Sequence, residues 1–251
     1  MKTLFVVADV HGFFKEMYYA LNEAGFDIHN DNHIFVSCGD LLDRGSEPKA
    51  CLQFVNMLPK HRKKLIMGNH EELLIQAIYR GYFESADIHN GTAKTVFDLT
   101  NIHGNDMAAL QQMMFDEDWQ EYIHSCINYY EIDKYIFTHG YVPLTYNDNR
   151  ELTYDPDWRS EFANWEGARW LNGMKMNHLG IKIPGKTIVC GHWHTSWGHC
   201  NLHNNGVEFA ETDAGIQSVH TPFYEEGLIA LDACTVYSGF VNCIKLEVED
   251  E

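Results

Sequence analysis

The chain has 251 residues, of which 45% are hydrophobic and 13% aromatic, a composition that excludes a disordered chain and allows a sizeable core. Its formal net charge is -18, from 36 acidic and 18 basic residues. This excess of negative charge argues against polymeric nucleic acid as the main ligand, because the surface repels phosphate backbones. No apolar run approaches the roughly 20 residues of a membrane span, so we expect a cytoplasmic protein without a membrane partner.

The cysteines predict reduced thiols rather than disulfides or a zinc–cysteine site. There are seven of them, with no Cys-x-x-Cys spacing, and several such as Cys38 and Cys190 lie in apolar runs. Reduced core thiols agree with the expected cytoplasmic location.

Five short apolar runs predict buried strands, at residues 4–8, 34–38, 65–67, 135–138 and 187–190. Amphipathic segments at residues 13–24, 48–58 and 71–80 follow the first three runs and predict helices. Each segment is followed by a helix-ending residue, namely Gly25, Pro59 and Gly81. This alternation predicts an α/β fold with parallel strand pairing and right-handed crossovers.

The rest of the chain has less regular patterns. Residues 85–125 look mostly helical, residues 128–138 predict two short strands, and residues 141–185 are loop-rich with a helix near 160–171. We expect a β-hairpin at residues 227–247, around Ser238 and Gly239. Without an internal repeat or linker, we expect one domain over residues 1–251, with a helical insertion at about 81–127 and a loop-rich insertion at about 141–185.

Each of the five predicted strands runs into polar residues that can bind a metal ion. In chain order these residues are Asp9, His11, Asp40, Asp43, Asn69, His70, His139, His192 and His194. Because the carboxyl ends of strands in an open α/β sheet converge on one edge, we expect these side chains to meet at one rim. Any one of these short motifs alone is weak evidence, but five in order, each at a strand end, indicate a site.

The mixture of carboxylate, imidazole and amide-oxygen ligands indicates which metals the site would take. Such a set suits Mn²⁺, Fe or Zn²⁺ better than the all-oxygen shells of Mg²⁺ and Ca²⁺. More than six candidate ligands are too many for one ion and suit two. Two ions roughly 3.5–4 Å apart can hold both the attacking and the leaving oxygen of an in-line displacement.

The motifs Asp-x-His-Gly, Gly-Asp-x-x-Asp-Arg-Gly, Gly-Asn-His-Glu, His-Gly and Gly-His, in this order, resemble the signature of the calcineurin-like metallophosphoesterase superfamily. The Asp-Arg-Gly ending and the Glu of the third motif resemble its bacterial phosphoprotein-phosphatase branch. The resemblance covers residues 3–72 densely, residues 136–140 and 187–194 as islands, and residues 230–239 as a terminal hairpin. It implies a four-layer α/β/β/α sandwich with mixed central sheets and a dinuclear metal site at the strand ends.

The resemblance also implies metal-dependent hydrolysis of phosphoesters by a metal-bridging hydroxide, with two divalent ions, manganese first and iron or zinc as alternatives. Its implied metal ligands are Asp9 and His11 for the first ion, Asp40 for both ions, and Asn69, His139 and His192 for the second.

The implied catalytic residues lie between these ligands. His70 would protonate the leaving oxygen, oriented by Asp43, and Arg44 would bind phosphate oxygens. Arg169 is a candidate for a second phosphate-binding arginine, although no motif surrounds it.

The chain departs from the family pattern at two positions. Ala8 replaces the usual Gly before the first Asp. The fifth motif is Gly-His-Trp-His, and in the wider superfamily the second histidine supports the first metal. His194 can reach the same centre as His192 only if the chain bends between them, because alternate side chains of an extended strand end point to opposite sides.

We expect structural rather than catalytic or metal-binding roles for the other histidines, aspartates and tryptophans considered. We assign surface or loop roles to His199, His203 and His220, a turn to Asp213, hairpin hydrogen bonds to Asp232, and packing to Trp165, Trp170, Trp193 and Trp197.

Three functions agree with this pattern. The first is a serine/threonine protein phosphatase-like phosphomonoesterase, whose partner is a phosphoprotein or a small phosphoester. The second is a dinucleoside-polyphosphate hydrolase of the diadenosine tetraphosphate type, which needs an adenine pocket. The third is a non-catalytic metal-binding scaffold, which the presence of His70, Asp43 and Arg44 disfavours.

Overall fold

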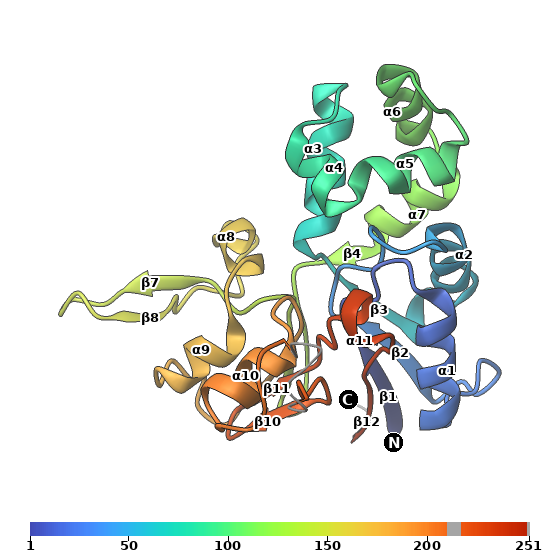
Figure 1. Ribbon diagram of the computed structural model, residues 1–251. Helices are drawn as coiled ribbons and strands as arrows, with labels where there is room; N and C mark the ends of the chain where they lie inside the picture. Colours follow the sequence, from blue (N-terminus) through green and yellow to red (C-terminus); the bar gives the residue numbers. More distant parts are fainter. Residues whose placement is uncertain (210–216, 250–251) are drawn as a thin grey trace.

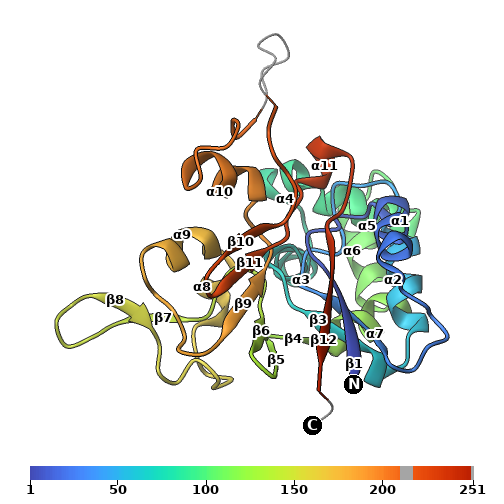
Figure 2. The same cartoon turned by 90° about the horizontal axis from the view of Figure 1, so that it is seen from below.

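The computed structural model describes residues 1–209 and 217–249, and in that part the strands form two five-stranded sheets and a separate hairpin (Figures 1 and 2). The first sheet has the order β12-β1-β2-β3-β4 and contains Lys2–Val7 (β1), His33–Ser37 (β2), Lys63–Ile66 (β3), Cys126–Ile127 (β4) and Cys243–Val248 (β12). The second sheet has the order β10-β11-β9-β6-β5 and contains Tyr130–Ile132 (β5), Tyr135–Phe137 (β6), Thr187–Cys190 (β9), Phe223–Glu225 (β10) and Leu228–Ala230 (β11). The hairpin Leu144–Tyr146 (β7) and Leu152–Tyr154 (β8) projects from the body (Figure 1).

The helices are Phe14–Ala24 (α1), Pro48–Met57 (α2), Asn69–Arg80 (α3), Ser85–Asn90 (α4), Thr92–Thr100 (α5), Asp106–Met114 (α6), Glu117–Ser125 (α7), Trp165–Arg169 (α8), Gly173–His178 (α9), Thr195–Asn201 (α10) and Thr235–Ser238 (α11), with a 3₁₀ turn at Lys60–Arg62. The helices up to residue 125 occur where the sequence predicts them, whereas α9, α10 and α11 were not predicted. Helices α1 and α3 end at Gly25 and Gly81, whose left-handed φ angles of 86° and 76° glycine adopts without steric cost. In the described part, no helix is long and apolar enough to cross a membrane.

The side chains of β1 show how four layers arise. Leu4 and Val6 point into the cluster between the two sheets, whereas Phe5 and Val7 point into the cluster beneath the helices that cover the first sheet. A third cluster, which includes Ile136 and Ile188, lies on the outer face of the second sheet with residues of α8 and α9. The layers are therefore α/β/β/α, as expected, and Figure 2 shows both sheets between α1 and α2 on one side and α9 on the other.

Parallel pairing brings the strand ends together. Strands β1, β2, β3 and β4 are parallel in the first sheet, and β6, β9 and β11 are parallel in the second. The carboxyl ends of both sets meet at one rim of the sandwich, where the predicted ligands lie.

The prediction of a β-hairpin at residues 227–247 is wrong. Strand β11 pairs with β10 and β9, and β12 pairs antiparallel with β1 in the other sheet. The turn lies instead between β10 and β11, where Gly227 has a φ of 86°, and Gly239 caps the short helix α11. Both segments have strand-like patterns, but a local pattern does not say which strand is the partner. The helix expected near residues 160–171 is also shorter, at Trp165–Arg169.

Candidate metal centre

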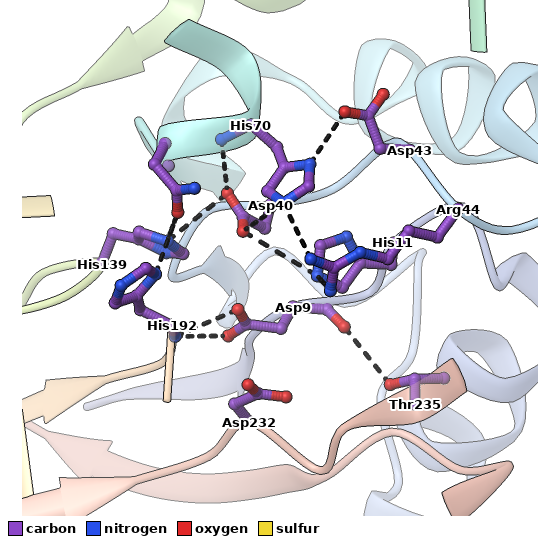
Figure 3. A network of polar contacts seen from close by, with 12 residues as sticks. Asp9, His11, Asp40, Asp43, Arg44, His70, His139, His192, Asp232 and Thr235 are labelled. Carbon is purple, nitrogen blue, oxygen red and sulfur yellow. Dashed lines mark hydrogen bonds and ion pairs between the residues drawn. The ribbon is translucent and has the colours of Figure 1, made fainter. Parts of the chain in front are cut away.

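The predicted ligands converge from both sheets (Figure 3). The backbone N–H of His192, after β9, donates to both carboxylate oxygens of Asp9, after β1, at 3.0 and 2.9 Å. This approach needs Gly191, because a Cβ there would lie 1.9 Å from Asp9 Oδ2. The end of the second sheet is thereby fixed against the end of the first.

Backbone strain is concentrated at this rim. Among the described non-glycine residues, eleven have a positive φ, and six of these are predicted site residues: Asp9, His11, Asp40, Asp43, Arg44 and His192. Such conformations cost of order 1–3 kcal/mol each and persist only where the surroundings enforce them. The positive φ of 67° at His192 is also the bend that the Gly-His-Trp-His segment requires.

Two buried imidazoles are oriented for metal binding. Nδ1 of His11 donates to the carbonyl of Leu42 at 3.1 Å, and Nδ1 of His139 donates to the carbonyl of Cys38 at 2.7 Å. Burial lowers the pKa of both histidines, so they are neutral and each Nε2 carries a lone pair. These Nε2 atoms lie 3.8 and 3.4 Å from the carboxylate oxygens of Asp40, so Asp40 stands between two candidate ion positions.

A second group of acceptors converges on Asn69. Its Oδ1 lies 2.7 Å from Nε2 of His139 and 2.9 Å from Nδ1 of His192, whose pKa is lowered to about 3 by burial and then by His139. Because neutral His139 carries its proton on Nδ1, its Nε2 is an acceptor. This nitrogen and Oδ1 of Asn69 are therefore two acceptors that face each other. A cation between them removes this repulsion, so the donor set fits a metal ion.

The geometry gives two overlapping groups of possible ligands that share one carboxylate. One group contains His11, Asp40 and His70, and the other contains Asp40, His139 and His192. Burial opposes ionisation of Asp40, but the surrounding imidazoles, of which His70 has a raised pKa, and the backbone N–H of His70, which donates to Oδ1 at 3.0 Å, outweigh burial and lower the pKa of Asp40. The carboxylate that faces both groups is therefore charged, as a bridging position requires.

His70 is held as a proton donor would be. Its Nδ1 lies 2.8 Å from Oδ2 of Asp43, which also accepts a hydrogen bond from the Thr92 hydroxyl at 2.7 Å. Burial lowers the pKa of His70, but Asp40 and Asp43 outweigh burial and raise it. The guanidinium of Arg44 lies 2.9 Å from Nε2 of His11 and 3.1 Å from Nε2 of His70, so a cationic group already occupies the space between the imidazoles.

Two predicted residues lie differently from the rest. Nδ1 of His194 lies 2.9 Å from the Ser196 hydroxyl and Nε2 lies 3.3 Å from a carboxylate oxygen of Glu208, outside both ligand groups. The chain does bend after His192, but His194 becomes the N-cap residue of α10 and turns away, so this position does not agree with a ligand role. Arg169 donates to Glu72 at 3.1 Å and to Asn128 at 2.6 Å.

Three residues at the centre were not among the predicted site residues, and one of them, Asp232, was assigned to a hairpin that does not form. Glu71 accepts hydrogen bonds from the backbone N–H groups of Asp40, Leu41 and Gly68 and from the Tyr122 hydroxyl. Thr92 binds Asp43 from α5 in the helical insertion, and no local signal marks it. Asp232 is buried beside Asp9 (Figure 3). Of the three, only Glu71 could have been found from the sequence, because it is the last residue of the Gly-Asn-His-Glu motif.

The first prediction separates ligands from neighbours. Titrated with Mn²⁺, the metal-free protein should bind two ions per chain. His192→Ala should weaken one site and leave the other occupied, whereas His194→Ala should retain two ions because its imidazole contacts Ser196 and Glu208 instead. Calorimetric titration with elemental analysis measures this. Loss of one ion in the His194 variant would restore that histidine as a ligand.

The second prediction concerns Glu71, whose pKa is raised to about 7 by burial and then by Asp40. Glu71→Gln places an NH₂ group against buried donors that need an acceptor, which costs roughly 1–3 kcal/mol. Urea unfolding of the metal-free protein at pH 8 should show this loss. Glu72→Gln is the control, since Glu72 is more exposed and pairs with Arg169, and should lose less. An unchanged midpoint for Glu71→Gln would contradict the role of this carboxylate.

Known proteins resemble this chain in sequence over about a third of its length. It is 36% identical over 74 residues to serine/threonine-protein phosphatase 1 of Salmonella typhimurium, covering 30% of this chain and 32% of that protein. It is 37% identical over 79 residues to a symmetrical bis(5'-nucleosyl)-tetraphosphatase of Buchnera aphidicola, covering 32% of this chain and 27% of that protein. These matches therefore span about a third or less of the curated relatives.

The fold and the family extend further along the chain. The solved structure of a cold-active protein-tyrosine phosphatase from a psychrophile, Shewanella sp., has a TM-score of 0.55 at 15% identity and covers 98% of this chain and 76% of that chain, a likeness of fold alone. The model of the calcineurin-like phosphoesterase family matches residues 2–196, which include every ligand and catalytic candidate predicted above. The chain therefore belongs to the calcineurin-like phosphoesterase family.

Proposed function

We propose that this chain is a metal-dependent phosphomonoesterase of the serine/threonine protein phosphatase type. The observation that carries the proposal is the buried His70–Asp43 pair, which lies beside Arg44 and beside two ligand groups that share Asp40. A phosphoester hydrolase needs these elements together: a proton donor for the leaving oxygen, a cation for the phosphate, and metal ligands.

Manganese is the first candidate for both ions, with iron or zinc as alternatives, because the ligand atoms are mixed nitrogen and oxygen. Asp9, His11 and Asp40 would hold one ion, and Asp40, Asn69, His139 and His192 the other. When bound, such a pair supplies Lewis acidity and a water nucleophile that is acidic enough at neutral pH.

The protein side chains divide the remaining work. His70, whose pKa is raised, would give a proton from Nε2 to the leaving oxygen, and Asp43 orients the ring by accepting from Nδ1. Arg44 would bind phosphate oxygens with its two terminal nitrogens. Arg169, whose Nε has no hydrogen-bond partner in the described part, would reach phosphate.

The similarity to serine/threonine-protein phosphatase 1 supports a phosphoprotein substrate, and the similarity to bis(5'-nucleosyl)-tetraphosphatases supports a second candidate function. One observation favours that alternative. The indole ring of Trp170 is 49% exposed, and its centroid lies 5.7 Å from that of His192. An exposed aromatic face beside a metal ligand can stack on a purine base. Dinucleoside-polyphosphate hydrolysis therefore remains the second candidate.

The third prediction tests His70 as the acid. His70→Ala should lower kcat on an alkyl phosphate by about 10²–10⁴-fold, the usual contribution of a general acid, with both metal ions retained. The loss should be smaller for nitrophenyl phosphate, because its leaving group needs little protonation. Asp43→Asn should give the same pattern, since Asp43 acts through His70. Equal losses on both substrates, or loss of metal, would assign His70 another role.

The fourth prediction decides between the substrates. With Mn²⁺, kcat/KM should be higher for a phosphoserine peptide than for diadenosine tetraphosphate, and Trp170→Ala should change the peptide value little. If the chain is instead a dinucleoside-polyphosphate hydrolase, kcat/KM should be higher for diadenosine tetraphosphate. Trp170→Ala should then lower that value roughly 5- to 150-fold, which corresponds to the energy of one stacked base. Trp165→Phe, a core substitution at the first residue of α8, the helix whose C-cap residue is Trp170, is the control for packing effects.

A further inference from the structure

A sixth strand end reaches the metal centre. Strand β11 is parallel to β9, with Ala230 opposite Cys190, and the pairing continues with a 2.9 Å hydrogen bond from Leu231 N to the Cys190 carbonyl. Two residues beyond the pair lie Asp232 in one strand and His192 in the other. The register therefore brings Asp232 to the rim at the level of a candidate metal ligand.

The side chain of Asp232 is built into this position. It is 7% exposed, one carboxylate oxygen accepts a 2.6 Å hydrogen bond from Cys234 N, and its carbonyl accepts one from Thr195 N at 2.8 Å. The Thr235 hydroxyl, three residues on, donates to the main-chain carbonyl of Asp9 at 3.2 Å. The segment after β11 is thus attached directly to Asp9, and Figure 3 shows the Asp232 carboxylate beside that residue.

The charges explain why a carboxylate in this place needs a cation. Asp9 is 1% exposed and Asp232 is 7% exposed, and Figure 3 shows the two side chains next to each other, with the carboxylate of Asp40 nearby. Buried carboxylates destabilise one another unless positive charge compensates them. Arg44 compensates in part, but it lies toward His11 and His70. A divalent ion on the side of Asp9 would compensate the remainder.

We propose that Asp232 supplies a further carboxylate to the metal ion bound by Asp9 and His11, the role that the sequence pattern had suggested for His194. The inference rests on the proposed metal-dependent function. It predicts that Asp232 acts on the first ion and leaves the second, bound through Asn69 and His139, unaffected. His194 turns toward Glu208 and makes local contacts instead. In this proposal Asp232, which was expected to make only structural hydrogen bonds, is the metal ligand in its place.

The test is Asp232→Asn, which keeps the shape and the acceptor for Cys234 N but removes the charge. Titration of the metal-free protein with Mn²⁺ should show about a 10- to 100-fold weaker first site and an unchanged second site. Thermal unfolding without metal should give an equal or higher Tm than wild type, because repulsion with Asp9 is relieved, while the rise in Tm on adding Mn²⁺ becomes smaller. Asp87→Asn is the control, since Asp87 is a buried carboxylate that pairs with Arg80 in the helical insertion. It should lower the metal-free Tm and leave both Mn²⁺ affinities unchanged.

The outcomes are distinct. A purely structural Asp232 would give the pattern of the control, a lower metal-free Tm with unchanged metal affinities, and would overturn the inference. Wild-type protein that binds no Mn²⁺ would instead contradict the proposed function itself.

Discussion

The centre depends on one buried carboxylate, that of Glu71, which is 1% exposed. It accepts hydrogen bonds from the loop after β2, from Gly68 after β3, and from Tyr122 in α7. These donors come from separate segments and would be left without partners in a buried place, so one side chain fixes the ends of two strands and the start of α3. Asp40 and His70 take their positions from this junction, because both belong to the segments it joins.

Two features near Glu71 destabilise the folded protein. Carboxylates are buried close together, and several of the predicted site residues have left-handed backbone conformations. Neither feature benefits the metal-free protein, because repulsion and strain both lower the free energy of unfolding. Cations bound at this centre would offset both costs, since a ligand that binds only the folded state stabilises it by mass action. Stability and metal binding are therefore coupled in this centre.

The two sheets have different parts in the centre. The first sheet supplies Asp9, His11 and Asp40, and α3, which follows β3, begins with Asn69 and His70. The second supplies His139, His192 and Asp232 from three parallel strands. The hydrogen bonds from His192 N to Asp9 join the two sets, so neither sheet holds a complete site. The net charge of -18 does not prevent phosphate binding here, because Arg44 and bound cations would reverse the sign locally.

The sequence by itself determined the strand–helix alternation of the first third and the residues that gather at the rim. Hydrophobic period and short motifs are local properties, and parallel strands that end in ligands must meet at one edge. Only the tertiary structure decided the partners that lie far apart in the chain. The pairing of β11 with β9 brought Asp232 to the rim, Thr92 reached Asp43 from an insertion without a recognisable motif, and the start of α10 turned His194 away. Strand partners, register and the direction of a helix start depend on long-range packing, which a local pattern does not contain.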